Sequence, residues 1–284
     1  MAMQSKVEQL FLYHPGKAFP AISVTGDECS LQCDHCRAHY LKGMMPAPNP
    51  ADLIKIAKEL DAGGAEGMLV SGGCDKNGKI PLAPFLPALK RIKLETKLKV
   101  NLHTGLVDDE EASAIADANV DCISFDLVQD PEAIRKRLHL SCGPEAYAGT
   151  LTSLFTADIK SVVPHLLVGL SGEEDRFEIA AIEMAAKNPI DGLVILSLMP
   201  TKGTPMEGSQ SPSDDHLLEI VERAVDALDV PIILGCMRPR GNWELEIKAI
   251  GLGVRRIAMP SPKTEVWAKA QGYGIIKRSS CCVF

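Results

Sequence analysis

Residues 21–36 read Ala-Ile-Ser-Val-Thr-Gly-Asp-Glu-Cys-Ser-Leu-Gln-Cys-Asp-His-Cys, and this stretch decides the fold. An apolar, β-branched run at 21–26 leads into Cys29, Cys33 and Cys36, which are spaced CxxxCxxC. Three thiolates in one short loop suit a [4Fe–4S] cluster, which normally takes four cysteine ligands. With only three, one iron keeps an open position for a small molecule. We therefore expect a strand followed by a cluster-binding loop.

Strand-like segments recur after this stretch and alternate with segments of helical periodicity. Eight such alternations predict a parallel sheet in an α/β fold, closed into a (β/α)8 TIM-type barrel that is complete or nearly complete. An incomplete six-strand barrel is the alternative. The predicted strands are 21–26, 66–71, 98–103, 121–126, 160–168, 191–198, 231–235 and 254–259. The predicted helices are 51–62, 83–94, 109–118, 174–186, 213–228, 242–251 and 262–271.

Short connections and the absence of a low-complexity linker favour one domain in this chain of 284 residues. We expect an N-terminal segment at 1–20, the barrel at 21–271, and a C-terminal tail at 272–284 that folds over the barrel mouth. A further helix-like piece at 144–157 is expected to lie outside the barrel wall.

Composition and charge exclude several classes of function. Hydrophobic residues make up 46%, and no apolar run approaches the ~20 residues needed to cross a membrane. Thirty basic against 37 acidic residues give a net charge of −7, which disfavours a nucleic-acid partner. The N-terminus lacks the pattern of a signal peptide, and nine cysteines without an export signal indicate a reducing compartment and a metal or catalytic use. We expect a cytoplasmic protein without a membrane partner.

Small, polar or metal-binding residues follow every predicted strand. Reacting groups in parallel barrels come from these carboxyl ends, so the pattern supports an active site there. For His103 and His165, structural hydrogen bonding and a substrate role are equally open. The strand-end residues are the cysteine triplet, Gly72-Gly73-Cys74, His103, Asp126, the turns at 169–174 and 200–205, Cys236 to Arg238, and Pro260-Ser261.

The cysteine triplet and its preceding strand resemble those of the radical S-adenosylmethionine (radical SAM) superfamily, whose open iron binds the amino and carboxylate groups of SAM. Gly72 and Gly73 match the Gly-Gly-Glu turn that holds the SAM amino group, although Cys74 replaces the acidic residue. The resemblance covers about residues 21–260. It implies that the reduced cluster splits SAM and that a 5′-deoxyadenosyl radical then abstracts hydrogen from an unactivated C–H bond.

Two further turns carry the resemblance. The stretch 168–173 resembles the glycine turn along the adenosyl group, which implies cofactor-binding roles for Gly169 and Glu173. The run Pro-Thr-Lys-Gly-Thr-Pro at 200–205 looks like a turn of the biotin synthase and hydrogenase-maturase branch.

The resemblance also implies roles for three isolated residues. Asp126 would bind the ribose or methionine part of SAM, with helix capping as the alternative. Arg278 or Arg238 would orient SAM or the substrate.

The tail run Arg278-Ser279-Ser280 resembles the Arg-Ser-Ser motif of lipoyl synthases, in which a serine ligates an auxiliary [4Fe–4S] cluster that is consumed as the sulfur donor. Bacterial lipoyl synthases also carry an N-terminal cysteine triplet for that cluster, which this chain lacks. The two-component archaeal-type lipoyl synthase is therefore the better match. The expected auxiliary ligands are Cys74, Cys236, Cys281 and Cys282, and Cys142 could replace any of them.

The combined resemblance implies sulfur insertion into an octanoyl group on a lipoyl carrier protein. Arg278 and Ser279 would take part beside the triplet. The implied partners are the octanoylated carrier domain, a second radical SAM lipoyl synthase component and a reducing electron donor.

Two alternatives remain open. A biotin-synthase-like or hydrogenase-maturase-like enzyme would act on a small molecule with the same triplet. The other alternative is a non-catalytic iron–sulfur or zinc-binding protein. Structural zinc normally takes four ligands, and His35 and His39 could complete a zinc site with the triplet. Cys122, near the start of its strand, is expected to be a buried apolar residue.

Overall fold

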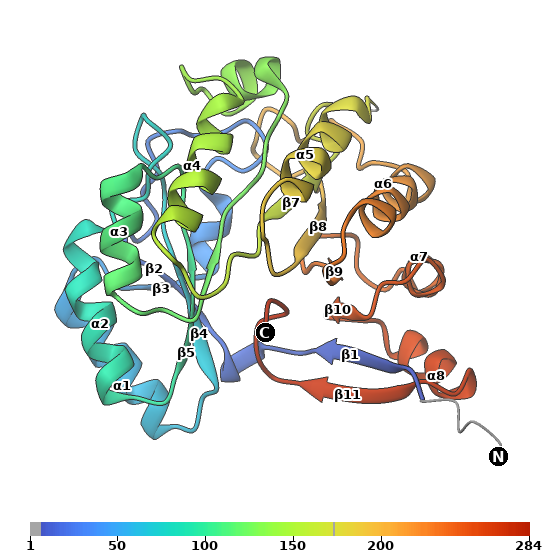
Figure 1. Ribbon diagram of the computed structural model, residues 1–284, viewed down its shortest axis with the longest axis horizontal. Coiled ribbons are helices and arrows are strands. Elements are labelled where there is room, and N and C mark those ends of the chain that lie inside the picture. Colours follow the sequence, from blue (N-terminus) through green and yellow to red (C-terminus); the bar gives the residue numbers. More distant parts are fainter. Residues whose placement is uncertain (1–6, 173) are drawn as a thin grey trace.

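The computed structural model describes residues 7–172 and 174–284 and is built from parallel strands surrounded by helices (Figure 1). All eight predicted strands are present within their expected ranges, which confirms the α/β barrel architecture. They are β2 (Ala21–Ser23), β4 (Gly67–Ser71), β5 (Lys99–His103), β6 (Cys122–Ser124), β7 (His165–Val168), β8 (Leu193–Ser197), β9 (Ile232–Leu234) and β10 (Arg256–Ala258).

Three further strands were not predicted from the sequence: β1 (Gln9–Tyr13), β3 (Met45–Pro46) and β11 (Gly274–Arg278). β1 pairs in parallel with both β10 and β11. Leu10 and Leu12 of β1 are fully buried, and this burial explains why the segment joins the sheet. The expected N-terminal segment and the expected tail therefore each add a strand to the barrel.

The strands form two sheets that make up the barrel wall. Their orders are β3-β2-β4-β5-β6 and β11-β1-β10-β9-β8-β7. Isolated parallel bridges from Ile123 to Val162 and from Asp126 to His165 join the two sheets at one side. Among the described residues, no strand pairing joins β1 or β11 to β2, so the wall has a seam at the other side.

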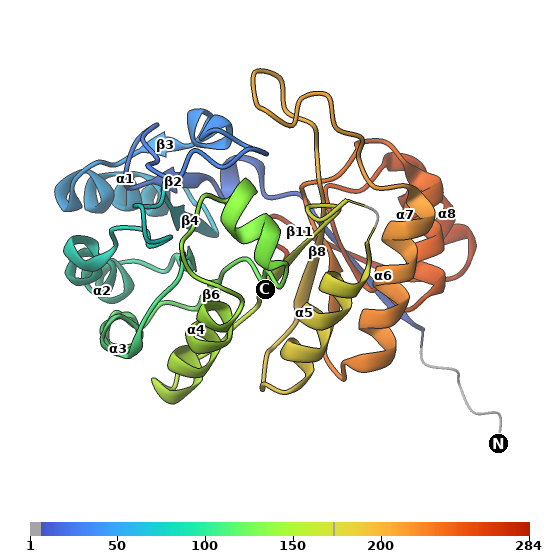
Figure 2. The ribbon, with the colours of Figure 1, turned by 90° about the horizontal axis from the view of Figure 1, so that it is seen from above.

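Helices surround the strands, as the view from above shows (Figure 2). They are α1 (Pro50–Ala62), α2 (Leu86–Glu95), α3 (Asp109–Asp117), α4 (Glu145–Thr156), α5 (Arg176–Ala186), α6 (Asp214–Ala227), α7 (Trp243–Gly251) and α8 (Pro262–Ala270). Short helical turns are η1 (Gly16–Ala18), η2 (His39–Gly43), η3 (Ala83–Phe85) and η4 (Ala133–Arg137). None of the described helices is long and apolar enough to cross a membrane.

The segment expected outside the wall as an irregularity is the regular helix α4, which connects β6 to β7 and packs against α3. Helix starts follow the capping residues in the sequence. The Asn49 side chain accepts from Asp52 N at α1, Asp108 and Glu111 form a capping box at α3, and Ser213 caps α6.

The last residues of the chain turn into the barrel interior and not over its mouth, which corrects the expected position of the tail. Cys282 and Val283 are buried, and the Phe284 ring lies 5.7 Å from that of Phe19. The Lys99 ammonium lies 5.1 Å from the same Phe284 ring, at the amino end of β5. Apolar side chains gain burial only inside the wall, and this explains the inward course. Figure 1 shows the C-terminus between the two sheets.

Candidate functional site

The cysteine loop after β2 is tied to the turn that follows β4. Gly73 N donates to Thr25 Oγ1 at 2.7 Å, and Ser30 N donates to the carbonyl oxygen of Cys74 at 2.8 Å. Two loops that follow neighbouring strands are therefore fixed against each other. This contact sets where the cysteines lie relative to the strand ends.

Gly73 makes the close contact between the two loops possible. A Cβ atom at Gly73 would lie 2.0 Å from the Glu28 carbonyl oxygen and 2.5 Å from Cys29 Cβ. Glycine at this position matches the turn that is expected to hold the SAM amino group. The structure adds a second reason, which is the approach of the cysteine loop itself.

The cysteine loop has left-handed backbone at three residues that are not glycine. The φ angles are 49° at Gln32, 44° at Arg37 and 59° at Ala38. Such a conformation costs roughly 1–2 kcal/mol per residue, so surrounding contacts must impose it. These residues flank Cys33 and Cys36 and curl the chain around their thiols.

One thiol of the triplet, that of Cys36, lies in an environment that favours its thiolate. A hydrogen bond from Cys33, together with the neighbouring His35, lowers the pKa of Cys36 to about 4. The same hydrogen bond raises the pKa of Cys33, which is buried. Thiolate is the form that binds metal, and the loop therefore presents sulfur ready for ligation.

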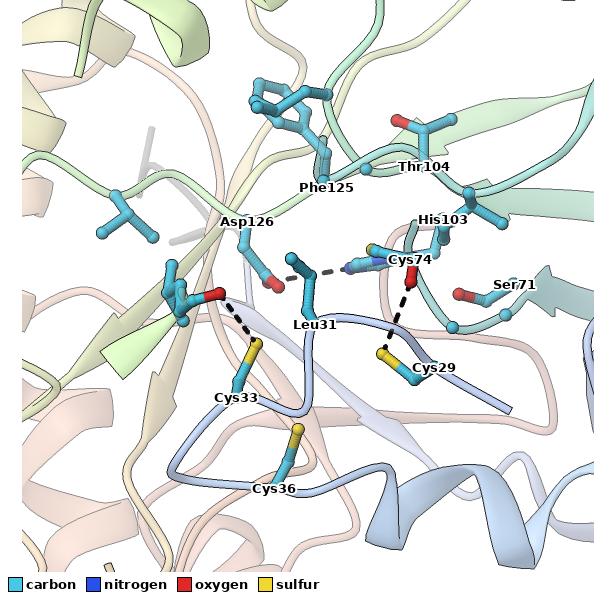
Figure 3. Close-up of a pocket in the computed structure, with 18 of the residues that line it drawn as sticks. Cys29, Leu31, Cys33, Cys36, Ser71, Cys74, His103, Thr104, Phe125 and Asp126 are labelled. Atoms are coloured by element: carbon cyan, nitrogen blue, oxygen red, sulfur yellow. Dashed lines mark hydrogen bonds and ion pairs between the residues drawn. The ribbon is translucent and has the colours of Figure 1, made fainter. Parts of the chain in front are cut away.

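The three sulfurs face one cavity of about 220 Å³ (Figure 3). His103 and Asp126 line the same cavity. Three converging thiols beside a cavity are the donor set of a [4Fe–4S] cluster with one free iron, so the residues present fit that group. Apolar residues that line the cavity include Ile80, Leu106, Phe125, Leu138, Leu140 and Leu170.

The loop at 200–205 closes over the cysteine loop. The Tyr40 hydroxyl and Thr201 Oγ1 lie 3.0 Å apart in a hydrogen bond. Met206 N donates to the carbonyl oxygen of Asp34 at 3.3 Å. The turn that resembles the biotin synthase branch thus contacts the cysteine loop, although it does not itself line the cavity.

Asp126 lies between two histidines at the ends of neighbouring strands. Its Oδ1 atom is 3.6 Å from His103 Nε2 and 3.9 Å from His165 Nδ1. The protein around Asp126 partly desolvates its carboxylate and so opposes ionisation, although the side chain is 54% exposed; the contact with His103 and the charges of the nearby histidines nevertheless lower its pKa to about 2. Burial and the neighbouring His103 lower the pKa of His165 to about 3. A carboxylate and a neutral imidazole therefore face each other at neutral pH.

Glu178 is a site residue that the sequence analysis missed. Its side chain on α5 is buried, and Oε1 accepts from Gly169 N at 3.1 Å. Gly169 has a φ of 88°, so this bond holds the turn that is expected along the adenosyl group. Glu173, expected in the same turn, lies outside the described residues. No sequence motif distinguishes Glu178 from the other acidic residues of its helix.

Cysteine side chains of the tail meet others inside the barrel. Cys281 Sγ accepts from Asn101 Nδ2 of β5 at 3.7 Å, and a hydrogen bond from Cys282 lowers the pKa of Cys281 to about 7. Cys236 is exposed in the turn after β9, and the protein around its thiol, followed by the charge of Cys281, raises its pKa. Burial raises the pKa of Cys122 to about 12, against the opposing effect of a hydrogen bond with Ser161, and the charge of Cys281 adds to the rise. The structure thus packs Cys122, Cys281 and Cys282 in one cluster, and Cys236 adjoins Met237, which packs against that cluster.

Three other predicted residues lie elsewhere. Cys74 lines the triplet cavity and is therefore separated from the tail thiols that it was expected to join. Cys142 lines a separate groove between α3 and α4. Arg238 is buried and pairs with Glu246 at 2.5 Å, and it also donates to the Gly235 and Ala258 carbonyl oxygens. This position supports the ends of β9 and β10 and argues against the expected role of Arg238 in orienting SAM.

The Arg-Ser-Ser run joins β11 to the tail cysteines. Arg278 is exposed at the end of β11, and its carbonyl oxygen accepts from His14 N at 2.7 Å. Ser279 is half-buried, and Ser280 is buried. The run therefore marks the point where the chain leaves the wall and enters the barrel.

Comparison with known sequences connects this geometry to a family. The sequence model of the Radical SAM superfamily matches residues 23–196, which is more than half of the chain. A biotin synthase from Rhodopseudomonas palustris (strain BisB18) is 28% identical over 205 residues, covering 68% of this chain. The chain spans 55% of the length of that relative.

Solved structures share the fold. The [FeFe]-hydrogenase maturase HydG superposes with a TM-score of 0.65 at 13% identity, over 88% of this chain and 57% of that one. Methylornithine synthase (PylB) gives 0.62 at 15% identity, over 89% and 73%. SuiB of Streptococcus suis, solved with S-adenosylmethionine, gives 0.59 at 14% identity, over 82% and 51%.

Proposed function

Because this chain belongs to the radical SAM superfamily, we propose that it inserts sulfur into an unactivated C–H bond of an octanoyl group on a lipoyl carrier protein. The family implies a [4Fe–4S] cluster and SAM. When bound, this pair supplies a 5′-deoxyadenosyl radical that abstracts hydrogen from carbon. We further propose that the enzyme works in the cytoplasm with a second radical SAM component and a reducing electron donor.

Residues of the first cavity have defined tasks in this proposal. Cys29, Cys33 and Cys36 would hold the cluster, and Gly72 and Gly73 line the same cavity, where their backbone would hold SAM. Glu178 holds the Gly169 turn in position. Together with the loop at 200–205, these elements exclude water from the place where hydrogen is abstracted.

The observation that carries the proposal is the second thiol group inside the barrel. Cys281 and Cys282 of the tail, and Cys236 of the turn after β9, do not line the triplet cavity. We assign them to a second iron–sulfur cluster that provides the inserted sulfur, with Cys122 as the fourth nearby thiol. Ser279 and Arg278 adjoin this group in the sequence.

An apolar wall in the first cavity supports an acyl substrate. Leucine, isoleucine and phenylalanine side chains face the space beside the triplet. A hydrocarbon chain gains free energy when it leaves water for such a wall. The carrier protein itself would dock at the carboxyl ends of the strands, where the cavity opens.

A second candidate function rests on the comparison with biotin synthase. That relative is 28% identical over 205 residues, and a biotin-synthase-like reaction on a free small molecule would use the same first cavity. It would not require an octanoylated protein.

One experiment separates the two reactions. The anaerobically reconstituted protein is incubated with SAM, a reductant and either an octanoyl-lysine peptide or free octanoate, and the products are examined by mass. We expect 5′-deoxyadenosine and a peptide that is heavier by one sulfur atom. A peptide of unchanged mass, with 5′-deoxyadenosine still formed, would favour a small-molecule substrate. No 5′-deoxyadenosine under any condition would contradict both functions.

A further inference from the structure

His103, Asp126 and His165 lie at one level inside the barrel. His103 ends β5, and Asp126 follows the end of β6. The bridge between Asp126 and His165 brings the start of β7 to the same height. The histidine rings lie side by side, with centroids 5.2 Å apart. Three adjacent segments of the wall thus direct two imidazoles and one carboxylate to a common point.

The spacing of these groups suits an ion between them better than direct hydrogen bonds. The Asp126 oxygen lies 3.6 Å and 3.9 Å from the two histidine nitrogens, whereas N–H···O bonds are typically about 2.7–3.2 Å long. Ligand atoms about 2.1 Å from a tetrahedral ion lie roughly 3.4 Å from one another. One ligand atom from each residue lies within 4.8 Å of the other two. A small relaxation would therefore bring all three to one ion.

The two histidine side chains are less exposed than Asp126, so an ion bound by the three residues would have one open side. The His103 and His165 side chains are 21% and 16% exposed, whereas that of Asp126 is 54% exposed. His103 and Asp126 line the cavity that contains the cysteine triplet (Figure 3). An ion bound by the three would consequently face this cavity.

We propose that His103, Asp126 and His165 bind one divalent transition-metal ion that is separate from the iron–sulfur clusters. Two imidazoles and a carboxylate select zinc, iron or a similar ion over magnesium or calcium, which prefer oxygen ligands. Three protein ligands leave a coordination position for an anionic group of a molecule in the cavity. In this arrangement Asp126 is a metal ligand and does not bind the SAM ribose. The proposal does not depend on which substrate receives sulfur.

Zinc uptake by the cluster-loaded protein tests the site. The anaerobically reconstituted full chain is exposed to Zn²⁺, passed over a chelating resin, and analysed for zinc and iron by mass spectrometry. We expect about one zinc per chain in the native protein, falling at least tenfold in His103→Ala and in His165→Ala. The exposed His14 provides the matched control, and His14→Ala is expected to keep its zinc.

X-ray absorption at the zinc edge identifies the ligands, and iron in the clusters does not interfere. Nitrogen and oxygen neighbours at about 2.0–2.1 Å support the proposal, whereas sulfur at about 2.3 Å would assign the zinc to cysteines and overturn it. Absence of bound zinc, or zinc that survives both histidine substitutions, would also overturn it. Asp126→Asn keeps the side-chain size and is expected to lose zinc without loss of iron, which guards against a misfolded variant. Failure of sulfur insertion leaves this result unchanged, so the two proposals can fail separately.

Discussion

The triplet cavity and the thiol group around the tail both consist of cysteines, but the two sets of cysteines are brought together in different ways. Cys29, Cys33 and Cys36 come from a single loop and face an open cavity. Cys281 and Cys282 instead pack in the barrel interior with Cys122 among apolar side chains, and Cys236 belongs to the turn after β9. A site built within one loop requires only local backbone geometry. A site built from distant segments requires the whole fold to be correct.

The largest expected effect comes from breaking the local site. Replacement of Cys33 by Ser removes one of three ligands of the first cluster. We expect 5′-deoxyadenosine formation to fall by about 1000-fold or more, which corresponds to about 4 kcal/mol in the barrier. Liquid chromatography of the nucleoside product measures this. The matched control is Cys142→Ser in the groove between α3 and α4, and similar losses in both variants would contradict the assignment.

Replacement of Cys282 by Ser is expected to separate the two sites. SAM cleavage should continue because the first cavity is untouched, whereas the sulfur-containing product should fall by about 100-fold, or about 3 kcal/mol. Iron should fall by about four atoms per chain if the lost group is a [4Fe–4S] cluster. Unchanged iron content together with an unchanged yield of sulfur product would remove the tail cysteines from the mechanism.

A third prediction tests whether the local site depends on its glycine. A Cβ at Gly73 would overlap the Glu28 carbonyl oxygen, so Gly73→Ala should lower the free energy of unfolding by about 1–3 kcal/mol. Thermal unfolding followed by circular dichroism measures the change. Gly208, with open space around it, provides the control Gly208→Ala. Equal melting temperatures for the two variants would show that the cysteine loop moves aside freely.

The smallest expected effect concerns the anchor of the tail. Phe284→Leu keeps an apolar side chain but removes the ring contact with Phe19 at 5.7 Å, and it should cost roughly 0.5–1.5 kcal/mol. Chemical denaturation measures the loss, and iron analysis shows whether the second group still assembles. Leu94 is exposed and provides the control Leu94→Ala. A native-like response to denaturant would mean that the tail thiols hold their position without the ring.

The barrel could be predicted because its strands carry a strong local pattern. All eight predicted strands are present, since each is a short apolar run that a buried parallel sheet requires. β1 and β11 could not be predicted in the same way. Their assignment to the sheet depends on pairing with each other and with β10, and no local pattern encodes such distant pairing.

The same distinction applies to the candidate site. The triplet and the strand-end glycines could be located from spacing alone. The sequence could not show which cysteines lie together. Cys74 lies beside the triplet because of a contact between two loops, and Cys122 comes near the tail only when the barrel has formed. Arg238 looked available for a ligand, and only the structure shows its buried partner Glu246.

The pairing of β1 with β10 and β11 has a consequence for the order of events during synthesis. Segments that form the triplet cavity leave the ribosome well before β10 and β11 exist. Contacts between such distant segments form late because closing a long loop costs entropy. We expect the N-terminal half to bind its cluster before the barrel is complete. The tail should then pack inside the barrel in the last step of folding.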